Sequence, residues 1–148
     1  MKRNAVITRI TLWVNRFIFL LLGLSVVILP TLLRWYVGYR PLTEAGRYAI
    51  LFAFYPCAIA AALALFHMDR LLCAILQEQI FTTNNVSHIR AIRWCSAAIS
   101  LICLPASLFY MPLVFMVLIM AFLSLAITVL VRVMTAAVEI REENDLTI

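Results

Sequence analysis

Three stretches of the chain contain no charged residue, and their lengths predict the architecture. They are Phe17–Leu33, Tyr48–Phe66 and Trp94–Val131, of 17, 19 and 38 residues. Each is apolar along its whole length and does not alternate between apolar and polar positions, which excludes the strands of a transmembrane barrel. A helix needs roughly 20 apolar residues to cross a bilayer, and it satisfies its own backbone hydrogen bonds there. The pattern therefore predicts membrane-spanning helices.

The third stretch is too long for one crossing. As a single helix it would measure about 57 Å, nearly twice a hydrocarbon core of about 30 Å. Pro105 and Pro112 lie near its middle, and a turn at Tyr110–Pro112 would make two antiparallel helices of it. We therefore predict an all-α, four-transmembrane-helix bundle in one integral membrane domain, with spans at about residues 12–33, 48–68, 91–109 and 112–132.

Two of the predicted helices continue beyond their apolar stretches. After residue 66, Leu72, Ile75 and Leu76 recur at helical spacing, so residues 67–93 read as a loop that includes an extension of the second helix. Thr82 or Thr83 is a candidate N-cap for the third helix. The fourth helix has no breaker before about Glu142, within a segment, 133–148, that becomes acidic.

Basic residues near the span ends predict the orientation. The N-terminal arm, the segment between spans two and three, and the C-terminal segment together hold nine of the twelve Lys and Arg residues, and the first loop holds the other three. Four spans place the first three regions on one face, so the positive-inside rule predicts that both termini are cytoplasmic. The first span lacks an Ala-x-Ala site between Ala5 and Ala45, which favours a retained helix over a cleaved signal peptide.

Composition narrows the classes of function. The chain is 66% apolar and 13% charged, with a net charge of +5, so four spans leave no room for a separate catalytic domain. No span contains an acidic residue in its interior, which argues against a proton-coupled exchanger. With 3 glycines there is no phosphate-binding loop, and no nucleophile and base lie at catalytic spacing. We expect no enzyme activity and no cofactor.

Cysteine, histidine and serine positions suggest structural roles. The four cysteines form no C-x-x-C pair, and His67 and His88 lie in no close Cys/His cluster, so no metal site is predicted. Ser96, Ser100 and Ser107 fall close to one stripe of the third span, which is typical of a face for close helix packing and interhelical hydrogen bonds.

Two short segments resemble a known family. IFTTNNVSHIRAI (residues 80–92) and EENDLTI (residues 142–148) are similar to the signature segments of the small four-span bacterial membrane proteins of the DUF2975 family, and they lie in the expected loop and tail. A departure is Ile80, where members commonly have Pro or another turn residue. The resemblance implies the inner membrane of a bacterium, no established activity, and frequent gene proximity to a very small helix-turn-helix regulator.

Charge suggests what the tail contacts. Four of the seven acidic residues lie within the last ten positions, and a DNA-binding protein presents a basic surface for which an acidic, partly apolar segment can compete. We hypothesise that loop and tail form one cytoplasmic docking surface for such a regulator, without direct nucleic-acid contact, comprising Phe81, Thr82, Asn85, Val86, Arg90, Glu143, Asn144, Asp145, Leu146, Thr147 and Ile148.

Other readings stay open from the sequence alone. The tail could simply be a solvated end, and the chain could be a small transporter, a channel or an immunity-type membrane protein. It could also be a subunit of a larger membrane complex or form a homo-oligomer. In every case the lipid bilayer is a partner of the apolar spans.

Overall fold

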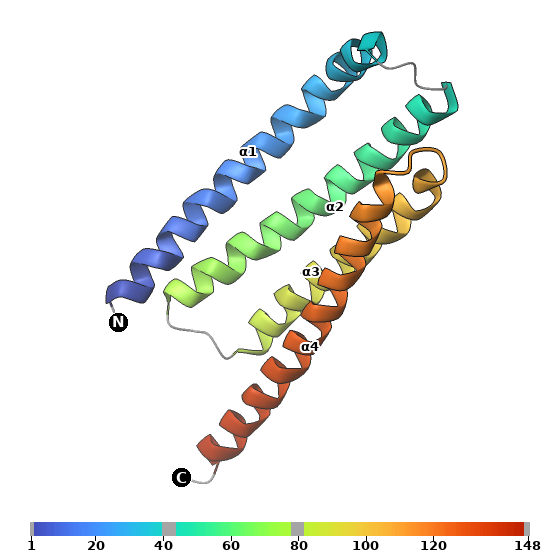
Figure 1. Cartoon of the computed structure of the whole chain (residues 1–148). Coiled ribbons are helices and arrows are strands. Elements are labelled where there is room, and N and C mark those ends of the chain that lie inside the picture. Colours follow the sequence, from blue (N-terminus) through green and yellow to red (C-terminus); the bar gives the residue numbers. More distant parts are fainter. Residues whose placement is uncertain (1, 40–43, 78–81, 147–148) are drawn as a thin grey trace.

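The computed structural model describes residues 2–39, 44–77 and 82–146, which form four long helices and, over these ranges, no strand. Figure 1 shows them in chain order as α1 (Lys2–Tyr39), α2 (Glu44–Leu76), α3 (Thr83–Ser107) and α4 (Leu113–Leu146). Each helix is long and apolar enough to cross a membrane. The predicted all-α, four-span fold is confirmed.

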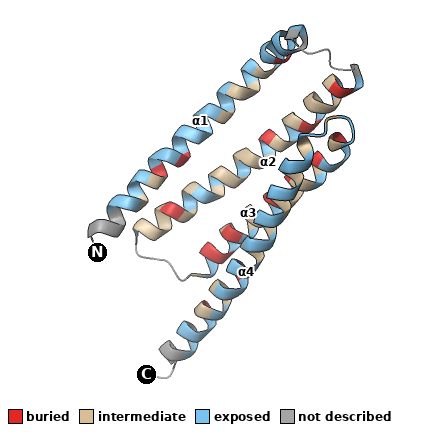
Figure 2. Ribbon diagram, in the orientation of Figure 1, coloured by how far each residue is buried: buried red, intermediate tan, exposed pale blue. Residues whose placement is uncertain are grey.

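The helices pack in a row in which each contacts its neighbours in the chain. Over the described residues, the backbones of α1 and α2, of α2 and α3, and of α3 and α4 approach closely, and those of no other pair of helices do. The bundle is therefore open, with α1 at one edge (Figure 1). Such an arrangement is acceptable in a bilayer because lipid tails cover apolar faces as well as another helix does. Trp13, Phe52 and Phe122 are accordingly among the large apolar side chains that are exposed. Figure 2 shows exposed positions along each helix.

Both chain termini lie at the same end of the helices, seen along their length (Figure 1). There α1 begins, α2 ends, α3 begins and α4 ends, and we call this end the termini side (Figure 1). As predicted, α2 and α4 continue well past their charge-free stretches, to Leu76 and Leu146. The fourth helix extends four residues further than the predicted Glu142, because nothing in its sequence breaks it.

The opposite end contains the tight connection between α3 and α4. Tyr110 N donates to Ala106 O at 3.1 Å and Leu113 N donates to Tyr110 O at 3.0 Å, which closes the predicted turn. Pro112 directly precedes α4, where its missing N–H costs no helical hydrogen bond. This turn holds α3 and α4 antiparallel.

Serine hydroxyls add polar contacts between these two helices. Ser100 Oγ donates to Val117 O of α4 at 3.1 Å, and Ser124 Oγ donates to Arg93 O of α3 at 3.4 Å. Ser107 instead donates to Leu104 O in its own helix at 2.6 Å. Ser100 thus contributes to the packing of α3 on α4, as predicted for the serine stripe. The hydrogen bond that Ser107 makes stays within α3.

Candidate functional site

The predicted docking residues concentrate where α3 begins and α4 ends. Thr82 occupies the N-cap position with extended backbone angles, although its side chain makes no capping hydrogen bond. The Asn85 N–H donates to Thr82 O at 3.0 Å, which starts the helix. Arg90 and Glu143 are exposed. This end of the row therefore presents charged side chains of both signs.

Two of the predicted docking side chains are buried. Asn85 is 1% exposed, the most buried side chain in the described chain, and Val86 is 5% exposed. Asn85 offers no surface to a partner, and Val86 contributes only to the wall of the cavity described below, so the main role of both in this arrangement is to pack the helices. Helical periodicity alone does not tell which face of α3 meets its neighbours, so the sequence could not separate these residues from Arg90.

Several other predicted positions carry no side-chain description. The backbone of Asn144, Asp145 and Leu146 belongs to α4, and nothing further is described for them. Phe81, Thr147 and Ile148 lie outside the described residues. The described part of the candidate site is therefore the start of α3 and the last turns of α4 up to Glu143.

A small apolar cluster fixes these two segments to each other. Val86 and Ile89 of α3 pack with Val131 and Val138 of α4, and all four are buried. Leu71 of α2 packs against the same cluster, together with partly buried residues of α4, Ile127 and Met134. The cluster thus holds α2, α3 and α4 together on the termini side. Because it includes Val138, α4 is still packed against its neighbours beyond its charge-free stretch.

A cavity of about 310 Å³ lies beside this cluster, between α3 and α4. Its walls combine apolar, hydroxyl and charged side chains, contributed by Thr83, Val86, Ser87, Arg90, Thr135, Val138 and Glu139. Arg90 and Glu139 are both exposed at it. Glu143 follows Glu139 by four residues, so the two lie on the same face of α4. The site therefore combines a cavity with a positively charged side chain on α3, Arg90, and two negatively charged side chains on α4, Glu139 and Glu143.

On the termini side, α2 and α3 are joined by a histidine pair. His67 Nδ1 and His88 Nδ1 are 2.9 Å apart, which is hydrogen-bond distance, so one ring donates and the other accepts. Arg70, one turn after His67, is a charged neighbour of His88, and its guanidinium carbon lies 5.3 Å from the Phe66 ring centroid. The two histidines are 21 residues apart in sequence, and no short spacing signals their contact.

The same region joins α1 to α2. Arg16 Nε donates to Asp69 Oδ1 at 3.1 Å, and the buried Asn15 donates through Nδ2 to Leu65 O at 3.1 Å. Arg16 and Asp69 are 53 residues apart, so no short spacing in the sequence signals their contact. These two contacts place α1 beside α2 over its first half.

The residues that the structure describes form no cluster of metal-binding side chains. Over residues 2–39, 44–77 and 82–146, no group of three or more His, Cys, Asp or Glu side chains is arranged to hold a metal ion. The candidate site is therefore described by its shape and charge.

Comparisons with known proteins assign the chain to a family and find no similar individual protein. The model of a family described as "Protein of unknown function (DUF2975)" matches residues 38–148. No curated protein and no solved structure matches the chain. The matched range includes both segments that carried the resemblance in the sequence.

Proposed function

This chain belongs to the DUF2975 family, and from that premise we propose that it is a non-enzymatic docking protein. In this proposal the bundle holds a small, basic helix-turn-helix regulator at the cytoplasmic face of a bacterial inner membrane. The family match and the four apolar helices support a more general statement, that the chain is a multi-pass membrane protein of a family of unknown function.

One observation carries the proposal. After its charge-free stretch α4 continues as a helix that packs on α3 as far as Val138. The exposed Glu139 lines a cavity together with Arg90, and the exposed Glu143 follows one turn later on α4. A DNA-binding domain is basic, so it complements the two acids on α4. The cavity would accept one apolar side chain of the regulator, and Arg90 would contact an acidic group near it.

The proposed sidedness rests on the distribution of basic residues. Nine of the twelve lie in segments on the termini side, which favours the cytoplasm for this side. A transcriptional regulator is a cytoplasmic protein, so the docking site and the regulator share a compartment in this orientation.

The test is co-purification of the full-length protein with a small helix-turn-helix protein whose gene, as the family resemblance implies, lies beside its own. We compare the double variant Glu139→Gln and Glu143→Gln with the unchanged protein. Two exposed charge contacts, each contributing about 0.5–1 kcal/mol, predict a loss of binding of about five- to thirtyfold. The matched control is Glu44→Gln with Glu78→Gln, which changes the net charge by the same amount outside the C-terminal segment.

The proposal fails if the Glu139/Glu143 variant retains as much regulator as the unchanged protein. It also fails if the control variant loses binding to the same extent, because the effect would then come from net charge alone. Raising the salt concentration from 50 to 300 mM provides a second check, since an interaction between exposed charges must weaken.

A further inference from the structure

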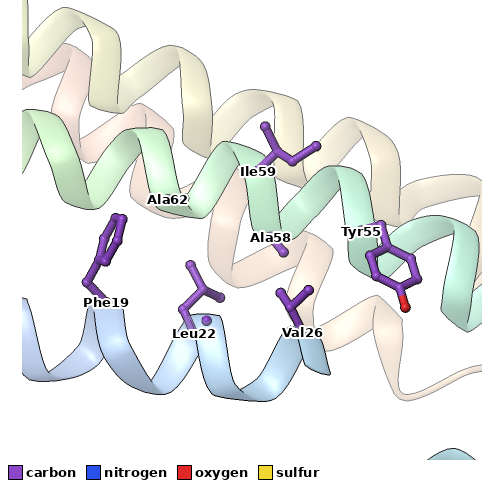
Figure 3. Close-up of a pocket in the computed structure, with 8 residues that line it drawn as sticks. Phe19, Leu22, Val26, Tyr55, Ala58, Ile59 and Ala62 are labelled. Carbon is purple, nitrogen blue, oxygen red and sulfur yellow. The ribbon is translucent and has the colours of Figure 1, made fainter. Parts of the chain in front are cut away.

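A groove runs along α1 and α2, separate from the candidate docking site. It consists of two adjoining cavities of about 350 and 240 Å³, both lined by Phe19. The first reaches the ion pair of Arg16 and Asp69, and the second continues along α1 to Val26. Figure 3 shows the second part, where side chains of α1 face small residues of α2. The groove thus has one polar end and one apolar end.

The groove is long enough for most of an acyl chain. Asn15 and Val26 lie at the two ends of the whole groove and are eleven residues apart, which is about 16 Å of helix. Gly23, Ala58 and Ala62 provide the space, since none has a large side chain. Over the described residues α1 contacts only α2, so the groove opens directly to the surrounding lipid.

The polar end lies at the level of lipid headgroups. The charge-free stretch of α1 begins directly after Arg16, and that of α2 ends three residues before Asp69. Both side chains therefore stand where the hydrocarbon region meets the headgroups. The side chain of Arg16 is 60% exposed and that of Asp69 28%, so a ligand can reach both.

The charge of this pair selects among headgroups. The contact between Arg16 Nε and Asp69 Oδ1 uses one of the five guanidinium N–H donors and one carboxylate oxygen. A phosphate is a strong acceptor for the guanidinium group, whereas a purely anionic headgroup also meets the negative charge of Asp69. A headgroup that adds a primary ammonium to the phosphate can bind both side chains.

We propose that the groove between α1 and α2 is a binding site for one phosphatidylethanolamine molecule. The lipid phosphate binds Arg16, its ammonium group binds Asp69, and one acyl chain lies along Phe19, Leu22 and Val26. Choline headgroups keep the positive charge but lack N–H donors, so they lose the hydrogen bond to Asp69. Glycerol headgroups have hydroxyl donors but no positive charge, so they lose the charge attraction to Asp69.

The experiment uses the full-length protein in bilayer discs that contain equal amounts of phosphatidylethanolamine, phosphatidylglycerol and phosphatidylcholine. The protein is extracted in mild detergent, and lipid that stays bound is counted by native mass spectrometry. We expect one retained phosphatidylethanolamine per chain, enriched about tenfold over each of the other two lipids. Arg16→Gln and Asp69→Asn should each abolish this enrichment.

A second variant tests the acyl-chain part. A Cβ atom at Gly23 meets nothing within 4 Å, so Gly23→Phe adds its ring to the groove without a backbone clash. Gly38→Phe is the matched control, because Gly38 also faces open space and does not line the groove. We expect lipid retention to be lost with Gly23→Phe and kept with Gly38→Phe, at unchanged helix content in both.

Three results would overturn the proposal. Preferential retention of phosphatidylglycerol would show that basic residues attract anionic lipid without a contribution from Asp69. Equal retention of all three lipids would show that the groove takes acyl chains without reading the headgroup. Unchanged enrichment in Arg16→Gln and Asp69→Asn would place the lipid elsewhere on the protein.

Discussion

The contact between His67 and His88 permits a quantitative test of how α2 is held to α3. The variants are His67→Phe, His88→Phe and the double variant, because phenylalanine keeps the ring and removes both nitrogen atoms. The two Nδ1 atoms are 2.9 Å apart, and both side chains are partly buried. Breaking the pair from either side therefore leaves one half-buried polar group in the other ring.

The expected sizes follow from that difference. A hydrogen bond between neutral groups contributes about 1 kcal/mol net, and a partner left without its hydrogen bond adds a desolvation cost, so each single variant should lose about 1–2 kcal/mol. Replacing both rings removes the polar group together with its partner. The double variant should then lose about 1 kcal/mol less than the sum of the two single variants.

The measurement is the free energy of unfolding of the four proteins in mixed micelles at pH 8. A cycle that combines His67→Phe with Ser124→Ala is the control, since Ser124 donates to Arg93 O in α3 and is not bonded to either histidine. The control coupling should vanish within about 0.5 kcal/mol. A His67–His88 coupling as small as the control would refute the contact.

The coupling between His67 and His88 should also decrease as the pH is lowered. Near pH 5 a free imidazole is mostly protonated, and two imidazolium N–H groups cannot hydrogen-bond to each other. Arg70, a further positive charge near His88, adds to the repulsion. The contact needs one unprotonated ring nitrogen as its acceptor, so the pair stabilises the folded state at pH 8 and loses that effect when both rings carry protons on both nitrogens. An equal coupling at pH 5 and pH 8 would contradict this reasoning.

Two further predictions concern the packing of α3. Ser100→Ala should lower the free energy of unfolding in micelles by about 0.5–1 kcal/mol because its hydroxyl bonds α4, whereas Ser107→Ala should change it by less than about 0.3 kcal/mol, and equal effects would contradict the assigned partners. Cys57 Sγ and Cys103 Sγ are 3.6 Å apart, so diamide, a two-electron oxidant, should join them into a disulfide. Counting free thiols by maleimide labelling after unfolding should show two fewer in the oxidised protein and no loss in Cys103→Ala.

The number of helices could be predicted from sequence because it follows from local properties. A charge-free stretch of sufficient length specifies a membrane helix wherever its neighbours lie. The same holds for the turn before α4, which Pro112 favours through its own missing N–H group. These features depend on a few adjacent residues, so the printed sequence contains enough information for them.

Contacts between helices could not be predicted in the same way. The pairs Arg16–Asp69 and His67–His88 depend on which helices are neighbours and how each is rotated about its axis. Hydropathy gives no information on either, because a lipid-facing and a helix-facing surface in a membrane are equally apolar. The open row of helices could not be predicted for the same reason, because a count of spans does not specify their order in space.

The buried positions of Asn85 and Val86 change how the loop signature is understood. Both match the family pattern, yet their side chains lie inside the protein, so this part of the signature describes how α3 starts and packs on α4. Arg90, Glu139 and Glu143, by contrast, are exposed at the surface. The family resemblance therefore covers both packing and surface residues, and sequence alone does not separate them.

This separation makes the docking proposal testable without unfolding the site. Val138 belongs to the buried cluster, whereas Glu139 is exposed, so removing residues 139–148 eliminates the acidic turns and keeps the contact between α3 and α4. Val138→Ala does the opposite: it weakens the cluster by about 1–2 kcal/mol and keeps both acids. If the regulator binds through charge, the truncation must abolish binding while the valine variant still binds. If it binds through the packed end of α4, both changes must weaken binding.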